Sequence, residues 1–236
     1  MPELAALGRL SYTFGEYEQL LQSLLADGFS FIPFKGSVDD DEIVLRHDVD
    51  LSPARALEMA KIEAAMDIQA TYCVLVTTPV YNLLEVTNAS ILHEIQALGH
   101  DVALHFNTHH YWSTQPSDDE LCTQVRAECD VLGTVLNRHV DLVSFHRPPE
   151  WVLGVDFDGF ENAYQPAYFS AITYRSDSSH KWRRQPPFPD GRPDRLQLLT
   201  HPGLWGETPR PMDEIVAGVG EERQNHVRTY LEGLES

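Results

Sequence analysis

The chain has 236 residues, of which 42% are hydrophobic, and this is enough for one domain with a large core. Its formal net charge of −19 argues against nucleic acid or an anionic membrane surface as a partner. The same charge disfavours a phosphate-rich polymer as substrate, unless a local basic pocket overrides it. No run approaches the roughly 18 apolar residues that cross a bilayer, and the first nine residues do not resemble a signal peptide.

The three cysteines, Cys73, Cys122 and Cys129, are odd in number and not clustered. Free thiols are typical of a reducing compartment, so we expect a cytoplasmic protein.

Predicted strands and helices alternate along the chain. Helix 13–27 has an apolar stripe, and helix 52–66 begins with a capping Ser52 and with Pro53 in its first turn. Three further helices are expected, which start at residue 88 or 90 and end at 98, run from 117 to 136, and run from 212 to 234. The predicted strands cover 29–34, 42–48, 70–76, 101–105, 142–145, 169–174 and 196–200, and 176–195 is expected to be a loop. This alternation indicates a single-domain α/β fold over residues 1–236 with a mainly parallel sheet.

Chemically active residue types follow these strands. In α/β folds, active groups collect at the carboxyl ends of the strands. Here those ends carry Asp48 and Asp50, His105, His146 and Arg147, Asp177, and His201.

The first of these groups is a pair of carboxylates with alternate spacing. Asp48 and Asp50 project to the same side if the strand persists, Arg46 shares that side, and His47 points away. One carboxylate can bind a metal while the other accepts a proton from water, and the metal relieves their mutual repulsion. The alternative is a solvated acidic turn that caps the next helix.

The second group is a pair of histidines. His105 and His109 can reach one metal if the chain turns helically after the strand, and imidazole suits zinc and related ions. His110 is the alternative partner of His105. Two loop histidines bonded to the backbone would give the same pattern without a metal.

Three later segments complete the candidate site. Arg147 could pair with a carboxylate and fix its orientation, and His201 is suited to donate a proton to a leaving amine. Asp177 could orient His201, while Tyr174 and Trp182 could line a sugar-binding groove. An ordinary surface loop is the competing interpretation of the last three residues.

Taken together, these segments resemble the motifs of the polysaccharide deacetylase superfamily, carbohydrate esterase family four, in the branch with a His-Asp-Val-Asp motif. The motifs occur in the family's order and span residues 46–202: Arg46-His47-Asp48-Val49-Asp50, then Gly99 to His105 with His109, then His146-Arg147-Pro148-Pro149, then Leu199-Thr200-His201-Pro202. In the usual first motif the two aspartates are adjacent, whereas Val49 separates them here.

The resemblance implies a distorted (β/α)7 barrel. It implies that Asp48 is the catalytic base, that Asp50, His105 and His109 bind the metal, that Arg147 orients Asp48, and that His201 is the general acid. The implied reaction is removal of an N-acyl group, such as acetyl, from a sugar by attack of metal-bound water. The implied metal is divalent, with Zn²⁺ expected first and Co²⁺, Mn²⁺ or Ni²⁺ as alternatives.

The expected substrate is a small acylated sugar or a nucleotide- or lipid-linked sugar, because no export signal is recognised. Two other functions fit the same residues. One is a catalytically silent carbohydrate-binding or regulatory protein that kept the metal site. The other is a different metal-dependent C–N hydrolase, which would act on a cyclic amide or a formamide.

Overall fold

The computed structural model of the protein describes residues 7–34 and 36–234. Its centre is a sheet of eight strands in which every paired neighbour is parallel. The sheet order is β6-β5-β4-β3-β2-β8-β7, with β1 beside β2. The strands are β1 Ser30–Ile32, β2 Glu42–Val49, β3 Thr71–Val74, β4 Asp101–Phe106, β5 Leu142–Phe145, β6 Glu161–Asn162, β7 Thr173–Ser176 and β8 Leu196–Thr200.

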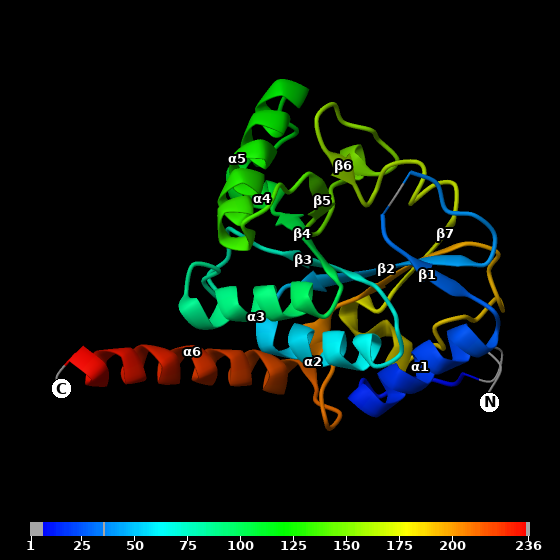
Figure 1. The fold of residues 1–236 in the computed structure, drawn as a ribbon, viewed down its shortest axis with the longest axis horizontal. Coiled ribbons are helices and arrows are strands. Elements are labelled where there is room, and N and C mark those ends of the chain that lie inside the picture. The colour runs from blue at the N-terminus through cyan, green and yellow to red at the C-terminus, as the bar shows by residue number, and fades with distance from the viewer. Residues whose placement is uncertain (1–6, 35, 235–236) are drawn as a thin grey trace.

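The sheet curls into a half-barrel with helices around it (Figure 1). The helices are α1 Phe14–Ala26, α2 Pro53–Ala64, α3 Val86–Ala97, α4 Thr108–Tyr111, α5 Asp118–Leu136 and α6 Met212–Leu234. The predicted α/β fold is confirmed, and the arrangement is consistent with a distorted (β/α)7 barrel.

Strand β2 is the middle of this arrangement. One of its edges pairs with β1 along Glu42–Val44 and then with β3 along Arg46–Val49, while the other edge pairs with β8. Seven of its eight residues are buried, including the charged Arg46 and Asp48. Charged side chains are rarely buried without partners, so we expect polar partners around Arg46 and Asp48 and a polar site at this end of the strand.

Three helix starts follow the signals in the sequence, whereas α3 begins at Val86, before the residues Asn88 and Ser90 that were expected to cap it. Thr13 and Glu16 form a capping box at α1, and Ser117 and Glu120 form one at α5. Ser52 caps α2 by accepting a hydrogen bond from the backbone N–H of Arg55.

The two-residue strand β6, Glu161–Asn162, has no counterpart among the predicted strands. The largest difference from the predicted strands is at 169–174, where β7 starts only at Thr173 and runs to Ser176. Residues 165–171 turn instead, because the N–H groups of Tyr168 and Phe169 both donate to the carbonyl of Gln165. The apolar side chains of this segment therefore cover the sheet from a loop.

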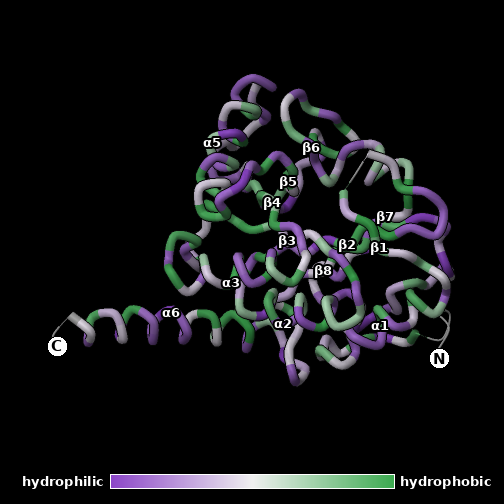
Figure 2. The backbone as a smooth tube through the Cα atoms, viewed as in Figure 1, coloured by the Kyte–Doolittle hydropathy of each residue, from purple (hydrophilic) through white to green (hydrophobic). Residues whose placement is uncertain are grey.

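Helix α6 projects away from the half-barrel (Figure 1). Hydrophilic and hydrophobic turns alternate along it (Figure 2), and Ile215 is its only buried residue in the described part of the chain. None of the helices that the structure describes has the length and apolar run required to span a bilayer.

Candidate functional site

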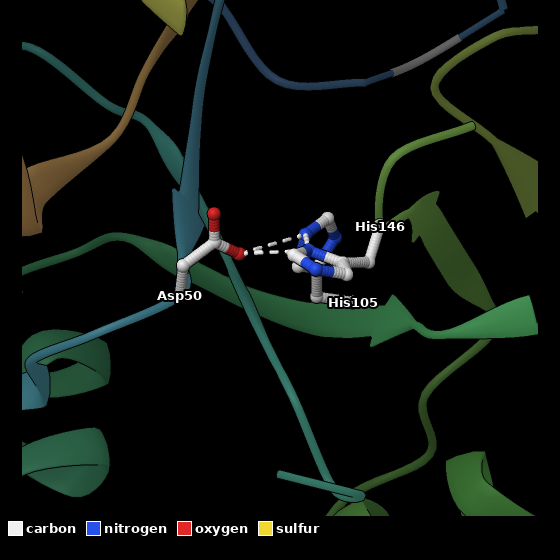
Figure 3. A group of neighbouring side chains, drawn as sticks. All are labelled: Asp50, His105 and His146. Atoms are coloured by element: carbon white, nitrogen blue, oxygen red, sulfur yellow. Dashed lines mark hydrogen bonds and ion pairs between the residues drawn. The ribbon is translucent and has the colours of Figure 1, made fainter. Parts of the chain in front are cut away.

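Three donor atoms meet at the carboxyl ends of β2, β4 and β5. Oδ1 of Asp50 lies 3.2 Å from Nε2 of His105 and 3.1 Å from Nδ1 of His146. The two imidazole nitrogens are themselves 3.1 Å apart. Figure 3 shows the carboxylate of Asp50 facing both rings. These three residues are the one group in the described chain whose side chains could share a metal ion.

The triangle of donors fits a divalent cation. Ligands about 2.1 Å from one ion lie about 3.0 Å apart in an octahedral site and about 3.4 Å apart in a tetrahedral one. The observed separations of 3.1–3.2 Å fall between these values. Two imidazoles and one carboxylate suit zinc and other first-row ions, and three protein ligands leave positions for small molecules.

The surroundings of Asp50 favour the ionised carboxylate, which is the form that binds a metal. Burial alone would raise its pKa, but hydrogen bonds with His105 and His146 outweigh burial and hold the pKa well below its usual value. Asp50 is therefore ionised at neutral pH and can bind a cation without first losing a proton.

Asp48 lies next to this group and is held from two directions. Arg46 donates from Nε to Oδ1 at 2.9 Å and from Nη2 to Oδ2 at 2.8 Å. Ser144 Oγ donates to Oδ1 at 3.0 Å and also contacts Nδ1 of His105 at 3.1 Å. Ser144 thus links the carboxylate of Asp48 to the ring of His105 and leaves Nε2 of that ring for a metal.

The charge on Asp48 is fixed by these contacts. Burial alone would raise its pKa, but Arg46 and the nearby His105 outweigh burial and lower the pKa to about 2. Arg46 is also bound by Gln197 Oε1 at 2.9 Å and by the Tyr164 hydroxyl at 2.6 Å. The guanidinium is therefore held rigidly and cannot turn away from Asp48.

On the other side of Asp48, His201 follows β8 and is paired with Asp177. Nδ1 of His201 lies 2.5 Å from Oδ1 of Asp177, and Oδ2 of Asp177 accepts from the backbone N–H of His201 at 3.0 Å. The indole N–H of Trp205 donates to the same Oδ2 at 2.8 Å. Burial would lower the pKa of His201, but Asp177, and more weakly Asp48 and Asp50, raise it to about 9. His201 is therefore protonated at neutral pH.

A second polar cluster lies behind the sheet. His47 points away from Asp48, as its position in the strand requires, and contacts Thr200 Oγ1 at 2.7 Å and Glu63 Oε1 at 2.8 Å. Glu63, on α2, also accepts hydrogen bonds from Tyr17 at 2.5 Å and Tyr72 at 2.7 Å. This cluster ties β2 to β8, the strands that carry Asp48 and His201.

The site opens into a cavity of about 650 Å³. Asp48, Asp50, His105, His146 and His201 line one part of it. The rest of the wall is mainly uncharged and includes Leu75, Pro79, Val80, Phe145, Tyr174, Leu204, Met212 and Val216. Such a cavity can hold a small ligand with a few polar contacts in fixed places.

The structure differs from the predicted site at three positions. His109 is exposed and its Nε2 lies 3.0 Å from the carbonyl oxygen of Arg147, whereas His146 joins His105 and Asp50. Because α4 starts only at Thr108, its first turn directs His109 to the segment after β5. His110, the alternative partner of His105, is exposed as well.

Arg147 does not orient Asp48, because Arg46 occupies both carboxylate oxygens. Arg147 is exposed and lines the cavity instead. Trp182 does not line the groove either: it is 1% exposed and packs against Tyr12 and Trp205, with ring centroids 6.3 and 6.2 Å away. Of the other predicted groove residues, Tyr174 lines the cavity and Asp177 is buried beneath His201.

Two functional candidates were missed, although the sequence contains a signal for each. Arg46 stands two residues before Asp48, on the same side of the strand, so pairing within the strand was available. His146 follows directly after β5, where an active group is expected. No signal in the sequence singles out Ser144.

No protein-family model matches the chain, and no curated protein matches it significantly. Among solved structures, it is similar to a CE4 family pseudoenzyme from Bacillus anthracis, with 16% identity, a TM-score of 0.49, and coverage of 84% of this chain and 67% of that one. For a variant of the peptidoglycan deacetylase PdaC from Bacillus subtilis, the identity is 16%, the TM-score 0.45 and the coverage 82% and 96%.

A family 4 acetyl xylan esterase from Clostridium thermocellum, in complex with a cobalt ion, has 13% identity, a TM-score of 0.42 and coverage of 78% and 84%. These structures belong to the family whose motifs the sequence resembles. At such identities the comparison concerns the fold alone, and the chemistry of this chain rests on its own side chains.

Proposed function

We propose that the protein is a metal-dependent hydrolase that removes an acyl group, acetyl first, from the nitrogen of a sugar or amino-sugar-like substrate. The observation that carries this proposal is the meeting at one cavity of three metal donors, the carboxylate of Asp48 held by Arg46, and the imidazole of His201 held by Asp177. A binding protein requires neither this carboxylate nor this imidazole.

Asp50, His105 and His146 would hold the metal. A divalent cation bound there would act as a Lewis acid on an acyl carbonyl and would lower the pKa of bound water. We propose zinc because the donors are two imidazoles and one carboxylate, and cobalt, manganese and nickel fit the same set.

Asp48 is the proposed general base. It lines the cavity next to the metal donors, and Arg46 and Ser144 hold both of its oxygens in place. Because its pKa is about 2, it is ionised throughout the neutral range and can accept the proton of an attacking water molecule. Arg46 is a positioning residue in this account.

His201 is the proposed general acid. Hydrolysis of an amide requires a proton for the leaving nitrogen, and His201 carries one at neutral pH because its pKa is about 9. Asp177 holds Nδ1 of the ring, which leaves Nε2 as the nitrogen that delivers the proton. Asp177 thus orients His201, as a neighbouring group commonly orients the acid or base of an enzyme.

The test is acetate release from a panel of N-acetylated sugars, which includes nucleotide- and lipid-linked ones, by protein loaded with zinc. Wild type is expected to turn over at least one of them, and Asp48→Asn to lose activity by 10²-fold or more while it still binds one equivalent of metal. Full activity of Asp48→Asn would overturn the assigned role.

The panel also separates the two other functions. Formate release, or opening of a cyclic amide, would identify a different C–N hydrolase. Saturable sugar binding without any product would identify a binding protein that keeps the metal site.

A further inference from the structure

The charged residues of the cavity fall into two sets. The two carboxylates, Asp48 and Asp50, belong to the site described above, where Arg46 and the metal donors surround them. The protonated His201 belongs to the same site, and the two remaining charged residues in the wall are both cations, Arg147 and Lys181. This is unexpected in a chain with 36 acidic and 17 basic residues.

Arg147 follows His146 at the end of β5. Its side chain is exposed, forms no hydrogen bond or ion pair with another described residue, and faces the cavity. Its backbone adopts a left-handed conformation with φ 47°, and its carbonyl oxygen is held by His109. Non-glycine residues in this conformation are uncommon and cluster at functional sites.

Lys181 lies after β7, in the turn that also carries Asp177. The two residues before it, Ser179 and His180, are left-handed as well, with φ 57° and 52°. Within the described chain its ammonium group forms no hydrogen bond or ion pair. Burial lowers the pKa of Lys181, and the attraction of Asp177 does not make up for it. Lys181 therefore lines the cavity with no hydrogen-bonded or ion-paired partner among the described residues.

The two cations follow strands near opposite ends of the strand order. The curl of the sheet brings these ends together, because the rings of Tyr164, after β6, and Tyr174, on β7, lie 6.3 Å apart. β5 lies next to the β6 end of the strand order, and β7 forms the opposite end. Arg147 is therefore on the side of His105 and His146, and Lys181 is on the side of His201. Arg147 adopts a left-handed backbone and Lys181 follows two residues that do, and both residues line the cavity.

We propose that the substrate carries an anionic group, a phosphate or a carboxylate, in addition to its acyl group, and that Arg147 and Lys181 bind this group. The inference rests on the proposed function and narrows its substrate to acylated amino sugars with a negative charge. The two cations place positive charge in the cavity wall outside the proposed catalytic groups, although the whole chain is strongly acidic.

The test compares three related substrates with the zinc-loaded enzyme: neutral N-acetylglucosamine, N-acetylglucosamine 1-phosphate and N-acetylmuramic acid, which has a carboxylate. We expect kcat/KM to be at least tenfold higher for one of the two anions than for the neutral sugar. The preferred anion identifies the group. Equal kcat/KM values for all three would overturn the proposal.

Variants of Arg147 and Lys181 test whether these two residues cause the preference for the anionic substrate. In Lys181→Met and in Arg147→Met the ratio of anionic to neutral kcat/KM is expected to fall about tenfold, and in Lys181→Arg it should be kept. Arg228→Met is the matched control, because Arg228 is exposed on α6 and does not line the cavity. An unchanged ratio in both pocket variants would contradict the assignment.

Binding to metal-free protein separates this inference from the proposed function. Calorimetric titration is expected to show tighter binding of the same anionic sugar than of N-acetylglucosamine, by about tenfold, with the preference lost in Lys181→Met. If the protein binds the anionic sugar more tightly but no substrate releases acetate, the proposed deacetylase function is wrong and the proposed anionic ligand is supported. If acetate is released without any preference, the function stands and this inference fails.

Discussion

Replacing Arg46 by Met tests which arginine holds the candidate base. The side chains of Arg46 and Asp48 are 0% and 3% exposed, and their two hydrogen bonds measure 2.8 and 2.9 Å. Removing one partner of a buried pair leaves the other charge without compensation, which costs about 3–5 kcal/mol. For a chain of this length each kcal/mol shifts the Tm by about 2–4 °C, so we expect a decrease on the order of 10 °C.

The assay is thermal unfolding of metal-free protein at pH 7, followed by circular dichroism. Arg147→Met is the matched control and should change the Tm by no more than about 2 °C, because the guanidinium of Arg147 forms no contact of this kind. The double variant Arg46→Met with Asp48→Asn should recover part of the loss, since it removes the unpaired charge.

The reasoning is refuted if Arg46→Met unfolds at the wild-type temperature. It is also refuted if Arg147→Met is destabilised as strongly, because Arg147 would then hold Asp48 as the sequence motif implied.

Two further predictions concern the neighbouring elements. Asp177→Asn should lower the pKa of His201 from about 9 toward about 6.5, measured by NMR titration of metal-free protein. The pKa of His201 is higher in the folded than in the unfolded protein, so the stability that this pair contributes is complete below pH 6.5 and is lost as the pH rises through 9. The difference in unfolding free energy between wild type and Asp177→Asn should therefore shrink between these pH values. A constant difference would count against the pairing. Trp182→Ala should lower the free energy of unfolding, measured with denaturant, by about 3–5 kcal/mol, because the ring is buried against Tyr12 and Trp205. A decrease below about 0.5 kcal/mol would indicate that Trp182 lies in the groove and not in the core.

Most of the strands and helices could be predicted from the sequence because local signals mark them, although the short β6 and α4 could not. Capping residues such as Thr13, Ser52 and Ser117 fix the helix starts, and buried apolar runs mark strands such as β2 and β4. The strand before residue 176 was misplaced since the apolar residues at 167–172 pack from a turn, which hydrophobic pattern alone does not distinguish from a strand.

The site could be predicted in part, for a related reason. Residues at strand ends, such as Asp50, His105 and His201, come together because parallel strands end at one edge of the sheet. The choice between His109 and His146 depends on where the chain turns after β4 and β5, and sequence spacing does not contain that information. The same holds for Trp182, whose burial depends on its contact with distant Tyr12.

The central claim is that Asp50, His105 and His146 bind one divalent metal, and metal content tests it most directly. Protein incubated with zinc and then dialysed is measured by plasma mass spectrometry, together with His146→Ala and His109→Ala as a matched pair. We expect one equivalent of zinc in wild type and in His109→Ala, and its loss in His146→Ala. Loss in His109→Ala with retention in His146→Ala would contradict the assigned ligand set, and no metal in wild type would contradict the site itself.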